Sequence, residues 1–349
     1  MIASWLERSV APLDLARRAT LGLVLRHRAL GDLLSRRDRR LALVLIAHAS
    51  IAFVLAVYAP LLLLVLGPVA LGVVHVAADV RHLVLRRRLP AWWKGAVAAA
   101  CVFLVALRVV DVDGTRIALL ETTVVLAWLA LAVLSGSAIA RSRGRVVAGL
   151  LVVAALAVVA IGWPHATRLA FVHVHNVVAL VAWLVVFRRS PSRGAIVLPL
   201  CLIAIGAALL LVGAMVPVTW HAGNRELFGM HLLQAVDWIA PVQSTDAGIA
   251  LVTCFAFLQS VHYLVWLVVI PQDDVRGEGT LTFRMSARAL VRDFGTWGLL
   301  AVIVATITVL GAAFVDVLRT RAVYLSLAMF HGYMELALLA FFWARGRAR

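Results

Sequence analysis

The sequence is poor in charge and in cysteine. Only 14% of its 349 residues are charged and 64% are hydrophobic, with a mean hydropathy of +1.00. Soluble domains are nearer half apolar and a quarter charged. The three cysteines lie far apart inside apolar runs and form no CxxC pair. These shortages exclude an ordinary soluble enzyme, a disordered regulator and a secreted disulfide scaffold, and they predict a polytopic membrane protein.

Several signatures of known chemistry are also missing. The chain has no P-loop, GxSxG, GxGxxG or CxxCH in a usable context, so nucleotide hydrolysis, serine hydrolysis and c-type haem attachment lack support. It has no zinc-finger spacing and no basic stripe with interleaved aromatic residues, so the formal charge of +16 does not indicate a nucleic-acid partner. Excess arginine is instead typical of the cytoplasmic loops of membrane proteins.

Long apolar runs are abundant. At about 20 apolar residues per crossing, they predict an all-α bundle of ten transmembrane helices in a single domain, residues 41–344. The expected spans are 41–58, 60–86, 92–111, 116–139, 145–163, 165–187, 194–217, 245–270, 294–317 and 321–344. A tight hairpin at 58–60 divides the first span from the second, and another at 163–164 divides the fifth from the sixth. Residues 218–244 form a long outer loop with room for a short interfacial helix, and 271–293 form a cytoplasmic amphipathic loop.

Arginine-rich segments alternate along the chain and set the expected orientation. One side receives a basic amphipathic N-terminal segment and every arginine-rich loop, namely 1–40, 86–94, 141–143, 188–193, 276–292 and the tail 345–349. Such segments stay in the cytoplasm of a bacterial-type plasma (inner) membrane. Both termini are therefore expected to be cytoplasmic, with residues 1–40 on the membrane surface.

Ionisable side chains inside the spans are the main functional signal, because they are costly in lipid. Counted from the cytoplasmic ends at about 1.5 Å per residue, several lie in one slab about 10–20 Å deep. Five histidines on different helices form the expected metal-ligand set: His48, His75, His175, His262 and His331. Asp79 and Glu335 each follow a histidine by one helical turn and would orient these ligands or handle protons.

The sequence leaves open which of two neighbouring histidines faces the centre of the bundle. His173 and His175 differ by about 200° around their helix, so both cannot face one centre. The depth in the membrane favours His175, and His173 together with Asn176 is the alternative.

Glu121 lies near the outer end of its span and is expected to be solvated.

Neutral imidazole is the commonest side-chain ligand of iron, copper and zinc. The set therefore predicts a membrane-embedded metal oxidoreductase or oxygenase, with Asp79 and Glu335 as catalytic residues and a lipid substrate reached from within the bilayer. Two alternatives stay open. One is b-type haem between two histidines, for electron transfer or sensing. The other is a proton-coupled transporter that uses the same groups as a relay.

Residues 72–83, GVVHVAADVRHL, place His75, Asp79 and His82 on one helix face. This segment resembles the histidine–aspartate helix of the Brp/Blh family of membrane β-carotene dioxygenases, which reads roughly G-x-P-H-G-x-x-D-H. Val74 and Val76 stand where that family has Pro and Gly. The resemblance implies non-haem iron, with His75 as a ligand and Asp79 beside it, and an isoprenoid, carotenoid-like substrate.

Overall fold

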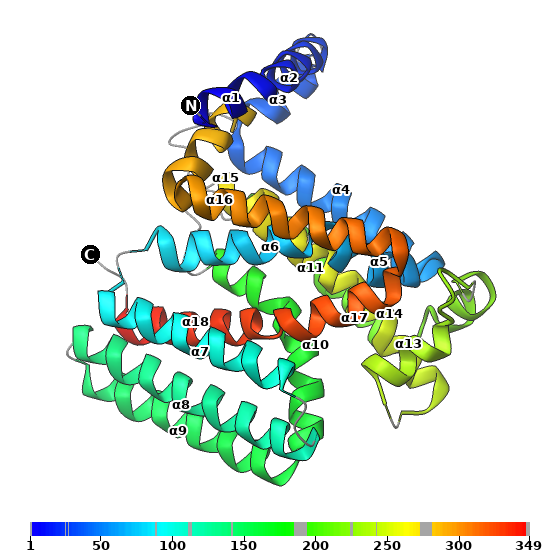
Figure 1. Cartoon of the computed structure of the whole chain (residues 1–349). Coiled ribbons are helices and arrows are strands. Elements are labelled where there is room, and N and C mark those ends of the chain that lie inside the picture. Colours follow the sequence, from blue (N-terminus) through cyan, green and yellow to red (C-terminus); the bar gives the residue numbers. More distant parts are fainter. Residues whose placement is uncertain are drawn as a thin grey trace.

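The computed structural model describes residues 2–24, 26, 28–87, 89–110, 114–140, 142–184, 194–223, 226–241, 243–272 and 281–346. Over these residues the fold is all-α (Figure 1), and no strand is present beyond an isolated bridge between Leu227 and Met230. Nine helices of this described part are long and apolar enough to cross a membrane. The prediction of an all-α polytopic membrane protein is thus confirmed.

The spanning elements follow the predicted runs closely. They are α4 (Arg37–Tyr58), α5 to η2 (Pro60–Leu85), α7 (Ala91–Val109), α8 (Gly114–Ala140), α9 (Arg143–Gly162), α11 (Gly194–Leu211), α14 to α15 (Thr245–Gln272), α16 (Phe283–Val315), and α17 (Val317–Ala328) joined to α18 (Phe330–Arg345). The predicted sixth span corresponds to α10 (Pro164–Ala182), whose described apolar part is shorter than the other nine helices. A tenth crossing therefore stays a prediction.

Proline fixes both predicted hairpins. Pro60 and Pro164 are the first residues of α5 (Pro60–Leu66) and α10, a position where a helix needs no N–H donor. The residues before them leave the helical region, with φ −149° and ψ 53° at Ala59 and φ −138° and ψ 66° at Trp163. Each proline thus ends one helix and starts the next.

Within the described residues, three π-helical segments adjoin the helices that carry His75 and His262. They are η1 (Gly67–Leu71) and η2 (Val80–Leu85), on either side of α6 (Gly72–Asp79), and η5 (Val265–Val269), between α14 (Thr245–Leu264) and α15 (Ile270–Gln272). Near η1, Pro68 lacks the N–H that would bond the Leu64 carbonyl. The Nε of Arg321 donates to that carbonyl instead, at 2.6 Å. Such π segments occur frequently at functional sites.

The helix α16 consists of two arms. Gly295 has φ +67°, which favours glycine, and it separates the arm before it from the arm after it. The first arm occupies the predicted amphipathic loop and the second the predicted ninth span. On the other side of the molecule, α12 (Val216–Val218) lies at the end of the predicted seventh span, and the predicted long loop holds η4 (Thr219–Gly223) and the short helix α13 (Leu232–Ile239).

The N-terminal segment is helical and lies against the first arm of α16. It comprises α1 (Ile2–Ser9), α2 (Ala11–Val24) and α3 (Arg28–Ser35), at the end of the molecule opposite α13 (Figure 1). Asp14 accepts hydrogen bonds from the backbone N–H groups of Phe283 at 2.9 Å and Arg284 at 3.1 Å. Arg288 pairs with Glu7 at 2.7 Å. These bonds hold the segment to the start of α16.

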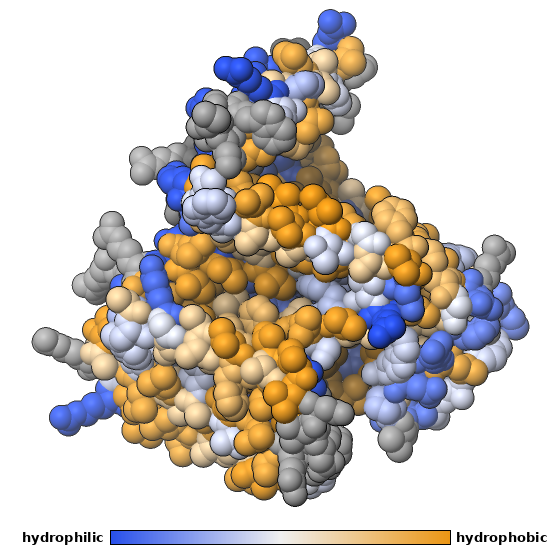
Figure 2. Space-filling view, viewed as in Figure 1, coloured by the Kyte–Doolittle hydropathy of each residue, from blue (hydrophilic) through white to orange (hydrophobic). Residues whose placement is uncertain are grey.

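The core is centred on α14. Most of its residues are buried, and it contacts α4, α5, α10, α11 and α13. By contrast, few residues of α9 and α16 are buried, as expected for helices that face lipid. Figure 2 shows apolar residues over the middle of the helices, with hydrophilic residues gathered over α1–α3 and around α13. This distribution agrees with an integral membrane protein.

Candidate metal centre

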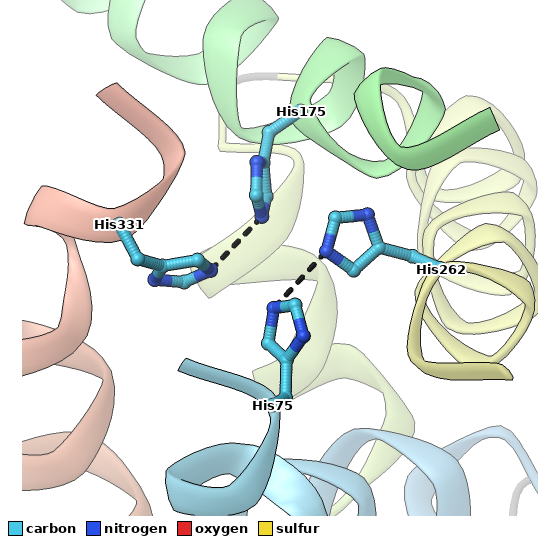
Figure 3. A group of neighbouring side chains, drawn as sticks. All are labelled: His75, His175, His262 and His331. Atoms are coloured by element: carbon cyan, nitrogen blue, oxygen red, sulfur yellow. Dashed lines mark hydrogen bonds between the residues drawn. The ribbon is translucent and has the colours of Figure 1, made fainter. Parts of the chain in front are cut away.

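Four histidines from four helices converge inside the bundle. His75 comes from α6, His175 from α10, His262 from α14 and His331 from α18, and their rings point toward one centre (Figure 3). One ring nitrogen of each lies within 4.8 Å of the others. The Nε2 atoms of His75 and His262 are 3.1 Å apart, as are those of His175 and His331. This is a compact nitrogen-lined site.

Two buried carboxylates lie beside the rings. The Oδ2 of Asp79 is 3.4 Å from the Nε2 of His75. The two oxygens of Glu335 face different rings, with Oε2 3.1 Å from the Nδ1 of His175 and Oε1 3.8 Å from the Nε2 of His262. Asp79, Glu335 and His75 form a second group whose ligand atoms lie within 4.8 Å of one another. Nitrogen and oxygen donors are therefore both available to one ion.

The Asp79 carboxylate is incompletely satisfied. Both carboxylates are fully buried, at 0% exposure. Among the described residues no hydrogen bond to either oxygen of Asp79 is present. A buried anion in low dielectric is costly unless a cation or a proton compensates it. Asp79 therefore holds a proton or is compensated by a positive charge at the histidine cluster.

Local sequence explains how the rings come together. His75 and Asp79, and likewise His331 and Glu335, are four residues apart and so share one helix face. Gly332 lets α18 approach α10 closely, since a Cβ there would lie 2.9 Å from the Nδ1 of His175. The Nδ1–H of His331 is placed to donate to the Ala328 carbonyl at the end of α17. That bond leaves the Nε2 of His331 with its lone pair toward the centre.

The structure corrects the expected ligand set at His48. Its Nε2 lies 3.0 Å from the carbonyl and 3.1 Å from the hydroxyl of Ser260, outside the four-histidine group. Ser260 precedes His262 by two residues, about 200° around α14, so His48 packs on the opposite face of that helix. Depth alone did not distinguish the two faces.

The choice between His173 and His175 is also resolved. His175 is in the group, whereas the Nε2 of His173 lies 3.0 Å from the Ile239 carbonyl, at the end of α13.

The expectation that Glu121 is solvated is wrong. It is 2% exposed, accepts a hydrogen bond from Tyr333 at 2.6 Å and pairs with Arg108. This pair links α7 and α8 to α18.

Sequence reasoning missed the aromatic residues around the cluster. The ring of Tyr263 lies 5.0 Å and that of Trp266 6.4 Å from the ring of His75, between centroids. The Trp266 side chain also interacts electrostatically with the Glu335 carboxylate. The available signal was spacing, because Trp266 follows His262 by one helical turn and so shares its face.

A cavity of about 300 Å³ opens beside the cluster. His175, His262 and His331 form one part of its wall, and most of the remainder is apolar. Tyr324 lines this cavity and also a separate apolar groove of about 640 Å³ between α6, α16 and α17. Space for an apolar molecule is thus available next to the nitrogen donors.

The donor set fits a transition metal. Ligand atoms about 2.1 Å from one ion lie about 3–3.4 Å apart when adjacent and about 4.2 Å apart when opposite. The two Nε2 pairs at 3.1 Å, with all four nitrogens within 4.8 Å, come close to these values. Asp79 and Glu335 would also compensate the positive charge of a bound ion. Imidazole and carboxylate together suit iron, zinc or copper rather than magnesium or calcium.

Comparisons with family models, with curated proteins and with solved structures found no match to this chain. The resemblance of residues 72–83 to the Brp/Blh helix therefore stays a prediction. The geometry of the site is the basis for any functional assignment.

Proposed function

We propose that the protein is a membrane-embedded, metal-dependent oxidoreductase or oxygenase that acts on a lipid or isoprenoid substrate. The observation that carries this proposal is the convergence of four imidazoles from four helices on one point, beside two buried carboxylates. A hydrogen-bonded packing role explains a single histidine in a membrane helix, but it does not explain four that face one another.

His75, His175, His262 and His331 would hold the metal, and non-haem iron is the ion we favour. Iron bound in this way would supply one-electron and oxygen chemistry at the cavity wall. Asp79 and Glu335 would fix the orientation of the imidazoles and compensate the charge of the ion. The Oδ2 of Asp79 would accept or release a proton on the His75 side of the site. The surrounding apolar wall would exclude water.

The substrate class is inferred from the surroundings of the site. The cavity is mostly apolar, and the neighbouring groove lies between α6 and the lipid-facing helix α16. A substrate delivered by the bilayer, such as an isoprenoid or carotenoid-like chain, fits these walls. We further propose ten crossings of a bacterial-type inner membrane with both termini in the cytoplasm, on the basis of the arginine alternation.

Haem b is the less favoured alternative. Bis-histidine haem needs two imidazoles on opposite sides of a flat macrocycle. Here the paired Nε2 atoms are 3.1 Å apart, and the other two imidazoles lie beside each pair (Figure 3). The geometry favours a bare ion over a macrocycle.

Elemental analysis and an optical spectrum of the purified protein test the proposal together. The expected result is bound iron without a Soret band. Iron with a Soret band would replace the proposal with haem b. Absence of any bound metal, with uptake in liposomes that depends on a proton gradient, would replace it with the proton-coupled transporter.

A further inference from the structure

The cavity beside the histidines has a charged group at its other end. Arg321 on α17 lines this cavity and is only 5% exposed. Within the described part of the chain no carboxylate pairs with it, and its partners there are the Leu64 carbonyl, Tyr263 and Trp238. A buried, unpaired guanidinium is costly. An anion from outside the described residues would offset this cost.

The Arg321 guanidinium is held in place by two contacts, and these leave several of its N–H donors available. Its Nε donates to the Leu64 carbonyl at 2.6 Å, and its Cζ lies 5.2 Å from the centre of the Trp238 ring. Of the five N–H donors of a guanidinium, the four on the two terminal nitrogens stay available for a ligand. A planar fork held by a carbonyl and an aromatic face suits bidentate binding of a carboxylate or phosphate.

The same cavity joins Arg321 to the histidine cluster. Tyr263 lies in the wall between them, close enough to Arg321 for an electrostatic contact and 5.0 Å from the ring of His75. Arg321 precedes His331 by ten residues along the nearly continuous α17 and α18. At 1.5 Å per residue this separation is about 15 Å. An extended chain anchored at Arg321 would therefore present its interior, not its head, to the histidines.

We infer that Arg321 binds the carboxylate or phosphate head of a single-chain amphiphile whose apolar chain extends along the cavity to the histidine cluster. This inference rests on the proposed function for the chemistry at the histidine end of the lipid chain. It narrows the proposed substrate class from lipids in general to anionic lipids. The anion site itself is formed by Arg321, Trp238 and the cavity wall, and it does not require a bound metal.

Binding to protein in nanodiscs of neutral phosphatidylcholine tests this inference. The probes are radiolabelled hexadecanoate, hexadecyl phosphate and hexadecanol, which differ in the head alone. Wild-type protein should bind the two anionic probes at least about tenfold more tightly than the alcohol, because a hydrogen bond to a charged group is stronger than one to a neutral group. Equal affinity for acid and alcohol would overturn the inference without any variant.

Variants assign the effect to one side chain. Arg321→Gln should weaken binding of the anionic probes about 10- to 100-fold and leave hexadecanol unchanged. Arg321→Lys keeps the charge and should retain part of the preference for anionic probes over hexadecanol. It replaces the glutamine variant if that variant does not fold. Arg319→Gln is the matched control, because it removes the same charge from an exposed position of α17 and should have no effect. An unchanged preference in both Arg321 variants would contradict the inference.

The same measurement after treatment with a chelator separates this inference from the proposed function. A preference that persists without metal and is lost in Arg321→Gln supports the anion site, whether or not a metal is ever found. A preference that requires metal and is insensitive to Arg321 would mean that the carboxylate binds the metal. That result would overturn the Arg321 assignment and leave the proposed metal centre standing.

Discussion

The bond from His331 to the end of α17 shows how a single contact sets the chemistry of a ligand. The Nδ1–H of His331 faces the Ala328 carbonyl, so the Nε2 is left for the centre, 3.1 Å from the Nε2 of His175. Helical periodicity in the sequence is enough to predict that Glu335 shares this face. It does not reveal the tautomer, because the tautomer depends on a backbone turn between two helices.

Asp79→Asn should weaken metal retention by about 10- to 100-fold, as is typical when a carboxylate that supports a metal-bound histidine is lost. The physical reason is that the amide keeps the shape of Asp79 but removes the charge beside His75. Metal content after dialysis against graded chelator measures the effect. Asp316→Asn, at the exposed cap of α17, is the control. Equal retention in wild type and Asp79→Asn would show that Asp79 does not support the site.

Gly332→Ala should reduce metal content while the protein stays folded. The added methyl would lie 2.9 Å from the Nδ1 of His175, so the ring or α18 must shift. Gly311→Ala makes the same change on α16, where nothing lies within 4 Å of the new Cβ, and should retain wild-type metal. If both variants bind metal equally well, the close approach of α10 and α18 is not needed for binding.

At the scale of elements, the sequence predicts the helices well because most are long apolar runs, several of them bounded by proline or arginine. The boundaries at Pro60 and Pro164 agree with the predicted hairpins. The sequence does not predict as well which face of each helix packs against its neighbours. His48 was placed in the site from its depth, yet α4 meets α14 on the face that carries Ser260. That choice depends on how two apolar helices pack, which hydropathy does not encode.

The contact between α2 and α16 should depend on pH. Burial opposes ionisation of Asp14, but the N–H groups of Arg284 and Phe283 together with Arg17 lower its pKa below the usual value. Because the folded pKa is depressed, the stabilisation is present above the unfolded pKa of about 3.9 and is lost as the pH falls through the folded pKa. Spin labels on α2 and on the first arm of α16 should therefore separate only below about pH 4.

Asp14→Ala should cause the same separation at pH 7, because the alanine cannot accept from the start of α16. Asp316→Ala, which removes a comparable cap from α17, should leave this distance unchanged. Spin labels that stay close in Asp14→Ala would mean that the Glu7 and Arg288 pair, or apolar packing, holds the N-terminal segment.

At the scale of the whole molecule, the arginine alternation and the helix order predict where tags become accessible. Tags at both termini should react only after the membrane is permeabilised, and a tag between α13 and α14 should react from outside. The element that decides the outcome is α10, whose apolar part is short. A C-terminal tag that reacts from outside would show that α10 does not cross.

The metal content of single histidine variants tests the central claim most directly. Wild-type protein purified in detergent should contain roughly one metal ion per chain. Alanine at His75, His175, His262 or His331 should remove most of it. Alanine at His48 or His173, whose Nε2 atoms contact Ser260 and the Ile239 carbonyl, should leave it unchanged. Metal-free wild type, or wild-type occupancy in the four cluster variants, would contradict a histidine-held metal centre.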